Sequence, residues 1–163
     1  MTRLSLTQAP HLKPRLTPLL MAALATLLML TMTGRASAES KDFGEHVVHY
    51  SIFPSGFLRP DVASQYNLNR SRSLGVVNIS IMEKQEDGTL APVGGQVEGQ
   101  VLNDVRQGKF LGFRRVTEGD AVYSLAQFQY RPGEMLTFQL TVRPQGSSRE
   151  LPIRVTKTLF DER

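Results

Sequence analysis

The sequence of 163 residues contains no cysteine. This absence excludes a disulfide bond, a thiolate nucleophile and a metal site built on cysteine, and it excludes the lipid-modified cysteine of a bacterial lipoprotein. A chain of this length can bury a core without such covalent links, because folds depend on them mainly below roughly 40 residues. We therefore expect one domain that is held together by packing alone.

A surplus of positive charge is also missing once the first 38 residues are set aside. The whole chain has 19 Lys and Arg residues against 15 Asp and Glu, and four of the basic residues, with no acid, precede Glu39. From Glu39 onward, 15 basic residues therefore face 15 acidic ones. With this balance we expect no nucleic-acid partner and no binding to an anionic membrane surface.

Sequence signatures of common enzyme sites are missing as well. The serine-hydrolase pattern Gly-x-Ser-x-Gly does not occur, and Gly94-Gly95 lacks the strand-to-helix setting of a phosphate-binding loop. The acids within residues 83–87 lack the oxygen spacing of a calcium loop. His46 and His49 are an odd number of positions apart, so in a strand they point to opposite faces and do not share a metal. We predict no catalytic residue, no metal site and no cofactor.

The first forty residues have the parts of a secretory signal peptide. Basic residues occur near the start, an apolar stretch covers residues 19–32, and the small-x-small triplet Ala36-Ser37-Ala38 precedes Glu39. Threonines interrupt the apolar stretch, which is shorter than the roughly 20 continuous apolar residues of a membrane-spanning helix. We expect cleavage after Ala38, in preference to an uncleaved anchor, with a periplasmic location and no stable membrane insertion of the mature chain.

From Glu39 onward, short runs of alternating apolar and polar residues are separated by turn residues, which is typical of an all-β sandwich or barrel. We predict strands at residues 45–53, 74–83, 96–102, 109–116, 121–130, 135–143 and 151–158. Gly112 divides the fourth run, and the last three runs form an antiparallel meander. One short helix is expected near residues 59–66, because Pro60 can occupy its first turn and Asp61 suits the positive end of the helix dipole.

The least ordinary polar residues are Arg70, Arg72 and Asn78. The arginines precede a predicted strand, and Asn78 lies within it, where Val, Ile or Thr is usual. A buried Asn needs hydrogen-bond partners, either the backbone of the preceding loop or a ligand held together with both arginines as an anion or peptide carboxylate. His49 and Tyr50 in the first predicted strand could add a titrating or ligating group. These five residues are the candidate binding residues.

Three segments show a further pattern: His49-Tyr50-Ser51-Ile52-Phe53, residues 57–66, and Gly75-Val76-Val77-Asn78-Ile79-Ser80. In these segments the chain resembles a known family of small exported proteobacterial proteins that are classed only as a domain of unknown function. The resemblance extends over essentially the whole mature region, including the closing Leu151-Pro152-Ile153-Arg154-Val155. It implies a periplasmic location and an immunoglobulin-like antiparallel β-sandwich of about seven strands, and it brings no known activity.

Together these patterns predict a periplasmic, non-enzymatic binding or accessory protein. Its partner would be an envelope protein, a peptide or another envelope component, recognised by an exposed sheet edge or by the loop that contains Arg70 and Arg72. The alternative is a small-ligand carrier or an enzyme with a site near His49, Tyr50, Arg70 and Asn78, which requires that these side chains converge on one concave pocket. A purely structural subunit of an envelope complex would instead show a large apolar surface patch.

Overall fold

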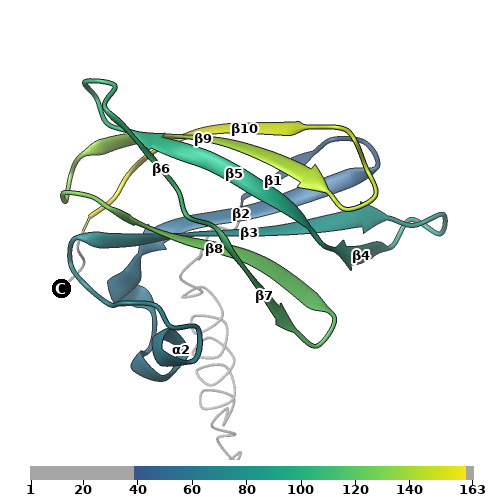
Figure 1. Ribbon diagram of the computed structural model, residues 1–163, viewed down its shortest axis with the longest axis horizontal. Coiled ribbons are helices and arrows are strands. Elements are labelled where there is room, and N and C mark those ends of the chain that lie inside the picture. Colours follow the sequence, from purple (N-terminus) through teal and green to yellow (C-terminus); the bar gives the residue numbers. More distant parts are fainter. Residues whose placement is uncertain (1–38, 161–163) are drawn as a thin grey trace, which may run out of the picture. The chain divides into compact units, whose positions relative to one another are not determined.

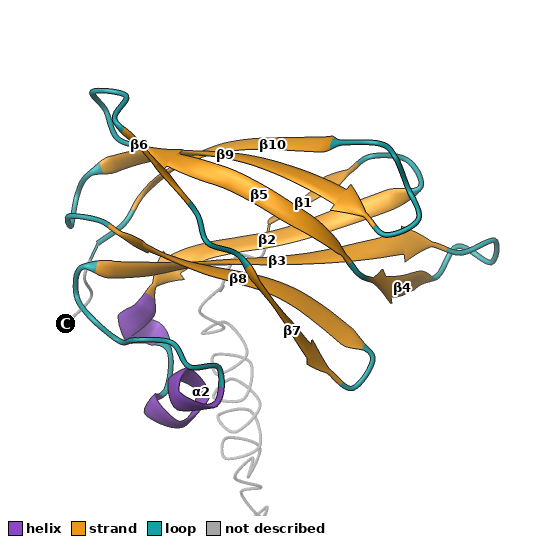
Figure 2. Ribbon diagram, in the orientation of Figure 1, coloured by secondary structure: helices purple, strands orange, loops and turns teal. Residues whose placement is uncertain are grey.

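Two antiparallel sheets face each other in the computed structural model, which describes residues 39–160 (Figure 1). The strands of the first sheet are β1 (Glu39–Asp42), β2 (His46–Pro54), β3 (Leu74–Lys84), β4 (Leu90–Val93), β7 (Arg114–Glu118) and β8 (Ala121–Gln129). The strands of the second sheet are β5 (Gly95–Leu102), β6 (Gly108–Phe110), β9 (Met135–Pro144) and β10 (Leu151–Thr158). The 3-10 turn η1 (Ser55–Phe57) and the helix α2 (Pro60–Gln65) connect β2 to β3 (Figure 2). The predicted all-β sandwich is confirmed.

The order of the strands is that of the immunoglobulin fold. The first sheet runs β1-β2-β3-β8-β7, with β4 paired to β3, and the second runs β10-β9-β5-β6. Strands β2, β3, β8 and β7 therefore correspond to the A-B-E-D sheet, and β10, β9 and β5 to the G-F-C sheet, with β6 added beside C. The immunoglobulin-like arrangement that the resemblance implies is thus present.

All seven predicted runs contain strands, but the described chain has ten. The predicted run at residues 109–116 is two strands, because the chain leaves the second sheet after β6 and enters the first sheet at β7. Gly112 lies in this crossing. The other two additional strands are β1 and β4, whose sequences ESKD and LAPV show no polar and apolar alternation.

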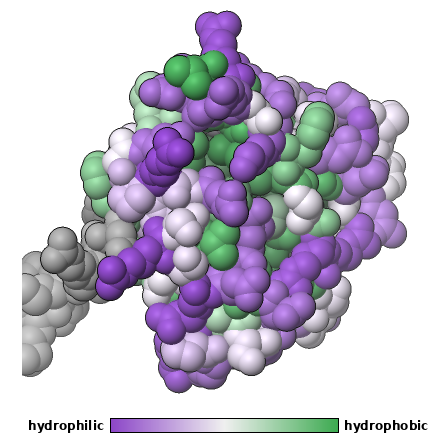
Figure 3. All heavy atoms as spheres, turned by 60° about the vertical axis from the view of Figure 1, so that its left-hand side comes forward, coloured by the Kyte–Doolittle hydropathy of each residue, from purple (hydrophilic) through white to green (hydrophobic). Residues whose placement is uncertain are grey.

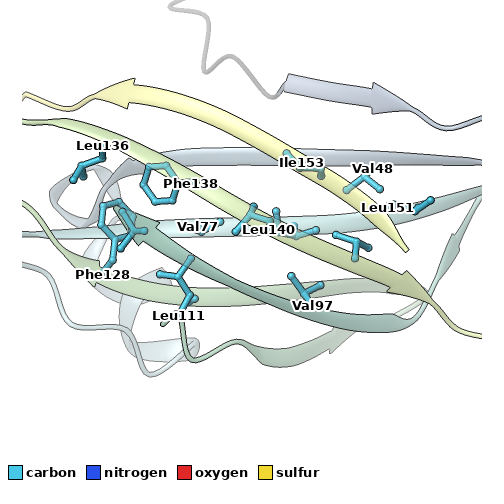
Figure 4. Close-up of a cluster of buried hydrophobic side chains, with 14 of the residues drawn as sticks. Val48, Val77, Val97, Leu111, Phe128, Leu136, Phe138, Leu140, Leu151 and Ile153 are labelled. Carbon is cyan, nitrogen blue, oxygen red and sulfur yellow. The ribbon is translucent and has the colours of Figure 1, made fainter. Parts of the chain in front are cut away.

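The main core lies between the sheets and is built by residues at every second position. From β3, Val77, Ile79 and Ile81 point inward, and from β9 the fully buried Phe138 meets them. Figure 4 shows side chains from both sheets meeting in this layer. Phe138 contacts the ring of Phe128 edge-on, with 4.9 Å between the ring centroids. Each large side chain buried here stabilises the fold by roughly 1.5–3 kcal/mol.

The opposite face of the first sheet is covered as well. Between β2 and β3, residues 55–73 leave the sheet and return over its outer face, carrying α2 below the sheet in the view of Figure 1. Ala63 and Leu68 from this segment pack on Val76 of β3 and Leu125 of β8 in a second, smaller core. The predicted helix is confirmed as α2, which has Pro at its start and an acid in its first turn.

The predicted signal peptide, residues 1–38, lies outside the described residues. Within residues 39–160, the helices are too short and too polar to span a membrane.

Candidate functional site

A groove of about 230 Å³ opens between α2 and the outer face of the first sheet. Its walls are mainly apolar and aromatic, with Phe53, Tyr66 and Tyr123 among them, and its polar side chains include Asn78 and Glu118. Apolar walls with a few placed polar groups are typical of ligand sites, although sites for drug-sized molecules take roughly 300–1,000 Å³. The α2 groove therefore has room for a single side chain or ring. In Figure 3, apolar surface lies between polar side chains near the middle of the face that is shown.

Asn78 supplies the groove with an unpaired acceptor. It lies in β3 between Ser51 of β2 and Leu125 of β8, on the outer face of the sheet. Its Oδ1 atom is buried and has no hydrogen-bond partner. One alternative from the sequence was a hydrogen bond between the Asn78 amide and the backbone of the preceding loop. The Oδ1 atom does not accept such a bond. An unpaired buried acceptor costs about 1–3 kcal/mol, and a ligand that donates a hydrogen bond to Oδ1 would remove this cost, so Asn78 is a candidate ligand contact.

Two hydrogen bonds tie the end of α2 to the end of β7. The Tyr66 hydroxyl donates to Oε2 of Glu118 at 2.7 Å, and the Gln65 amide donates to Oε1 of the same carboxylate at 3.1 Å. The hydrogen bond to Glu118 raises the pKa of Tyr66, because ionisation of the phenol removes the donor. Both bonds are exposed to water and therefore hold α2 only weakly.

The two arginines do not join Asn78 in one site. Arg70 donates from Nη2 to the carbonyl of Gly56 at 3.0 Å, so its guanidinium holds the η1 turn. Nearby, the amide of Ser71 donates to the Ser55 hydroxyl at 2.9 Å, which fixes the same loop. Arg70 and Arg72 are exposed, and neither contributes to the lining of the α2 groove. The predicted site that combines both arginines with Asn78 is therefore not assembled.

His49 and Tyr50 lie on opposite faces of β2. Tyr50 points toward the main core. Its pKa is raised mainly by burial and, to a smaller extent, by the hydrogen bond with Glu39. His49 is paired with Ser80 in β3 and points to the outer face. The four side chains of the alternative site, His49, Tyr50, Arg70 and Asn78, therefore do not converge on one pocket. Within residues 39–160, no cluster of three or more His, Asp or Glu side chains is placed to hold a metal ion.

The groove residues Tyr66, Tyr123 and Glu118 are not among the candidate binding residues that the sequence predicts. Residue 118 lies between two predicted strands, at residues 109–116 and 121–130, and Tyr66 is the last residue of the predicted helix. Their proximity arises because β7 pairs with β8, which brings the end of β7 next to the segment that covers the first sheet. The only local signal was Tyr123, an aromatic residue at an outward position of a strand.

Comparison with known proteins gives a family and a structural neighbour. No curated protein matches the chain. The crystal structure of a DUF4426 family protein from Pseudomonas aeruginosa PAO1, at 2.09 Å resolution, is similar to this fold with a TM-score of 0.66. The two sequences are 36% identical, and the similarity covers 77% of this chain and 97% of the other. The family model of DUF4426, a domain of unknown function, matches residues 40–162. The chain therefore belongs to the DUF4426 family.

Proposed function

We propose that this chain is a periplasmic, non-enzymatic binding protein that recognises an extended peptide, or an extended segment of an envelope protein, at the α2 groove. The observation that carries the proposal is the buried, unpaired Oδ1 of Asn78 in a groove with apolar and aromatic walls. The basic residues, apolar stretch and small-x-small triplet of residues 1–38 support the periplasmic location, because these are the parts of an export signal.

The chemistry of Asn78 favours a peptide as the occupant. A carboxamide has the same donor and acceptor groups as a peptide bond, so Asn can accept from a peptide N–H and donate to a peptide C=O. The remaining walls suit an apolar or aromatic side chain, for which the groove has the right size. One residue of a bound peptide would thus place its side chain in the groove and its backbone against Asn78.

The edge of the first sheet offers the rest of the binding surface. In the described part of the chain, β7 pairs on one side only, with β8. Alternate backbone N–H and C=O groups of such an edge strand face outward and can hydrogen bond to an added peptide strand. Glu118, the last residue of β7, also lines the α2 groove. A strand added to β7 therefore passes the groove, which gives main-chain affinity and side-chain specificity in one site.

A peptide display library tests this proposal, with the chain purified from the periplasm after expression of the full sequence. Peptides selected on the natural protein should share an apolar or aromatic residue at one position. Val62→Trp, which fills the groove from α2, and Asn78→Leu, which removes the acceptor, should each weaken the selected peptides at least ten-fold. Ser64→Trp is the matched control, because Ser64 is exposed on α2 and does not line the groove.

The proposal fails if no peptide is enriched. It also fails if enriched peptides bind Val62→Trp and Asn78→Leu as tightly as they bind Ser64→Trp. Thermal unfolding of all three variants shows that any loss of binding occurs in folded protein.

A further inference from the structure

The outer face of the second sheet differs in kind from that of the first. It presents polar side chains, including Gln100 from β5, Gln139 and Thr141 from β9, and Arg154 from β10. A wide, shallow hollow of about 840 Å³ extends along this face. Where the first sheet binds its own α2 segment through an apolar surface, the second sheet presents hydrogen-bonding groups to solvent.

One row of side chains crosses all four strands of this sheet in register. Phe110 of β6 is paired with Gln100, Gln100 with Gln139, and Gln139 with Arg154. Neighbouring strands are about 4.8 Å apart, so the row is roughly 14 Å long. Within it, the amide of Gln100 donates to Oε1 of Gln139 at 3.0 Å, which holds the two carboxamides side by side.

Phe110 is the exception in this polar row. Its side chain is 90% exposed at the end of the row, and it lines the same hollow as the two glutamines. Gly108, two positions earlier in β6, has no side chain to crowd the ring. The row therefore places an open aromatic surface directly beside fixed amide groups.

A second row lies alongside the first. Glu98 is paired with Thr141, and Thr141 with Pro152, whose carbonyl accepts a hydrogen bond of 3.0 Å from Nζ of Lys41. The polar side chains that line the hollow are thus one acid, two cations and three neutral hydrogen-bonding groups, and apolar residues such as Leu111 and Phe113 line the rest of it. Mixed charge of this kind does not suit a polyanion, which requires a consistently positive surface.

We propose that this face binds an oligosaccharide. A sugar ring has an apolar C–H face, which packs on an aromatic ring, and a rim of hydroxyl groups that both donate and accept hydrogen bonds. Phe110 provides the ring, and Gln100, Gln139, Thr141 and Glu98 provide donors and acceptors along the direction in which a linear glycan would extend. The glycan site lies on the opposite side of the sandwich from the α2 groove and does not depend on peptide binding there.

Nuclear magnetic resonance titration of the nitrogen-15-labelled protein, purified from the periplasm, tests the site with two soluble probes. Chitotetraose carries acetamido groups and maltotetraose carries only hydroxyls, so the pair distinguishes amido sugars from neutral sugars. With at least one probe, amide shifts should concentrate in β5, β6, β9 and β10.

Phe110→Ala should weaken that binding at least ten-fold, and Gln139→Leu should also weaken it. Phe160→Ala is the control. It removes another exposed ring, which is 62% exposed and lies outside this face, so this variant should bind the saccharide as the natural protein does.

The proposal is overturned if neither saccharide shifts the resonances of the second sheet at millimolar concentration. It is also overturned if Phe110→Ala, with an unchanged unfolding temperature, binds as tightly as Phe160→Ala. Shifts confined to β3, β7 and α2 would place saccharide in the α2 groove and would contradict the assignment to this face.

Discussion

The hydroxyl of Tyr66, the residue that follows α2, donates a hydrogen bond of 2.7 Å to Glu118, which lies 52 positions later at the end of β7. This bond joins the helix that covers the first sheet to the edge strand of that sheet. Both residues line the α2 groove. The same contact therefore positions one wall of the groove and raises the pKa of Tyr66.

Replacing Glu118 with Ala should lower the pKa of Tyr66 toward its ordinary value of 10.0. The carboxylate raises this pKa because it accepts a hydrogen bond that only the neutral phenol can donate. The folded value exceeds the unfolded one, so the contribution to stability is complete below pH 10 and is lost as the pH rises through the folded pKa. Ultraviolet absorbance titration of the phenolates measures the shift. Tyr66→Phe identifies which transition is lost, and an unchanged curve in Glu118→Ala would contradict the assignment.

Asn78→Leu should leave the free energy of unfolding unchanged or raise it by about 1–2 kcal/mol. The substitution removes a buried acceptor that has no partner and replaces it with an apolar group of similar size. Asn78→Asp is the opposite control, because a charge at this position should destabilise the fold. Urea unfolding measures both. A loss of more than about 1 kcal/mol in Asn78→Leu would show that the carboxamide stabilises the scaffold, which would remove the main support for its role in binding.

Gly75→Ala should destabilise the protein by about 1–3 kcal/mol, because an added Cβ would lie 2.3 Å from Cζ of Phe128. Phe128 cannot move freely, since its ring also packs edge-on against the fully buried Phe138. Gly56→Ala is the matched control: no atom lies within 4 Å of its added Cβ, so the change should stay within about 0.5 kcal/mol. Equal stability of the two variants in urea unfolding would show that the β3 to β8 packing adjusts easily.

The sequence was sufficient for most of the fold because the decisive pattern is local. The alternation of Val77, Ile79 and Ile81 with Val76 and Asn78 fixes which side of β3 faces the main core, and the structure has this orientation. The polar strand β1 was missed for the same reason, because it has no apolar alternation of its own and forms by pairing with β2. Local pattern also could not show that the chain changes sheets at Gly112, since that depends on the partners of β6 and β7.

The candidate sites were much less accessible from the sequence. Asn78 could be identified as a candidate from the sequence, because an Asn within an apolar strand is unusual whatever the neighbours of that strand are in the sheet. Tyr66 and Glu118, by contrast, are far apart in the chain and meet only through sheet pairing. The row from Phe110 to Arg154 likewise depends on the register of four strands, and a shift of one residue in any of them would turn its side chain to the other face.

Lys157→Met should destabilise the protein near neutral pH and have less effect in acid. Lys157 in β10 donates to Glu39 in β1, which connects the edges of the two sheets, and this hydrogen bond is the main reason that the pKa of Glu39 lies below its ordinary value of 4.5. A lowered carboxyl pKa contributes stability that is complete above pH 4.5 and is lost as the pH falls through the folded value.

The difference in unfolding temperature between the natural protein and Lys157→Met should therefore be constant from pH 7 to about pH 5 and shrink below it. Lys109→Met is the control, because Lys109 donates to the neutral amide oxygen of Gln129, so its removal should have an effect that does not depend on the charge of a carboxylate. A difference that stays constant down to pH 3 would mean that Lys157 stabilises the edge through packing of its aliphatic chain and not through the charge of Glu39.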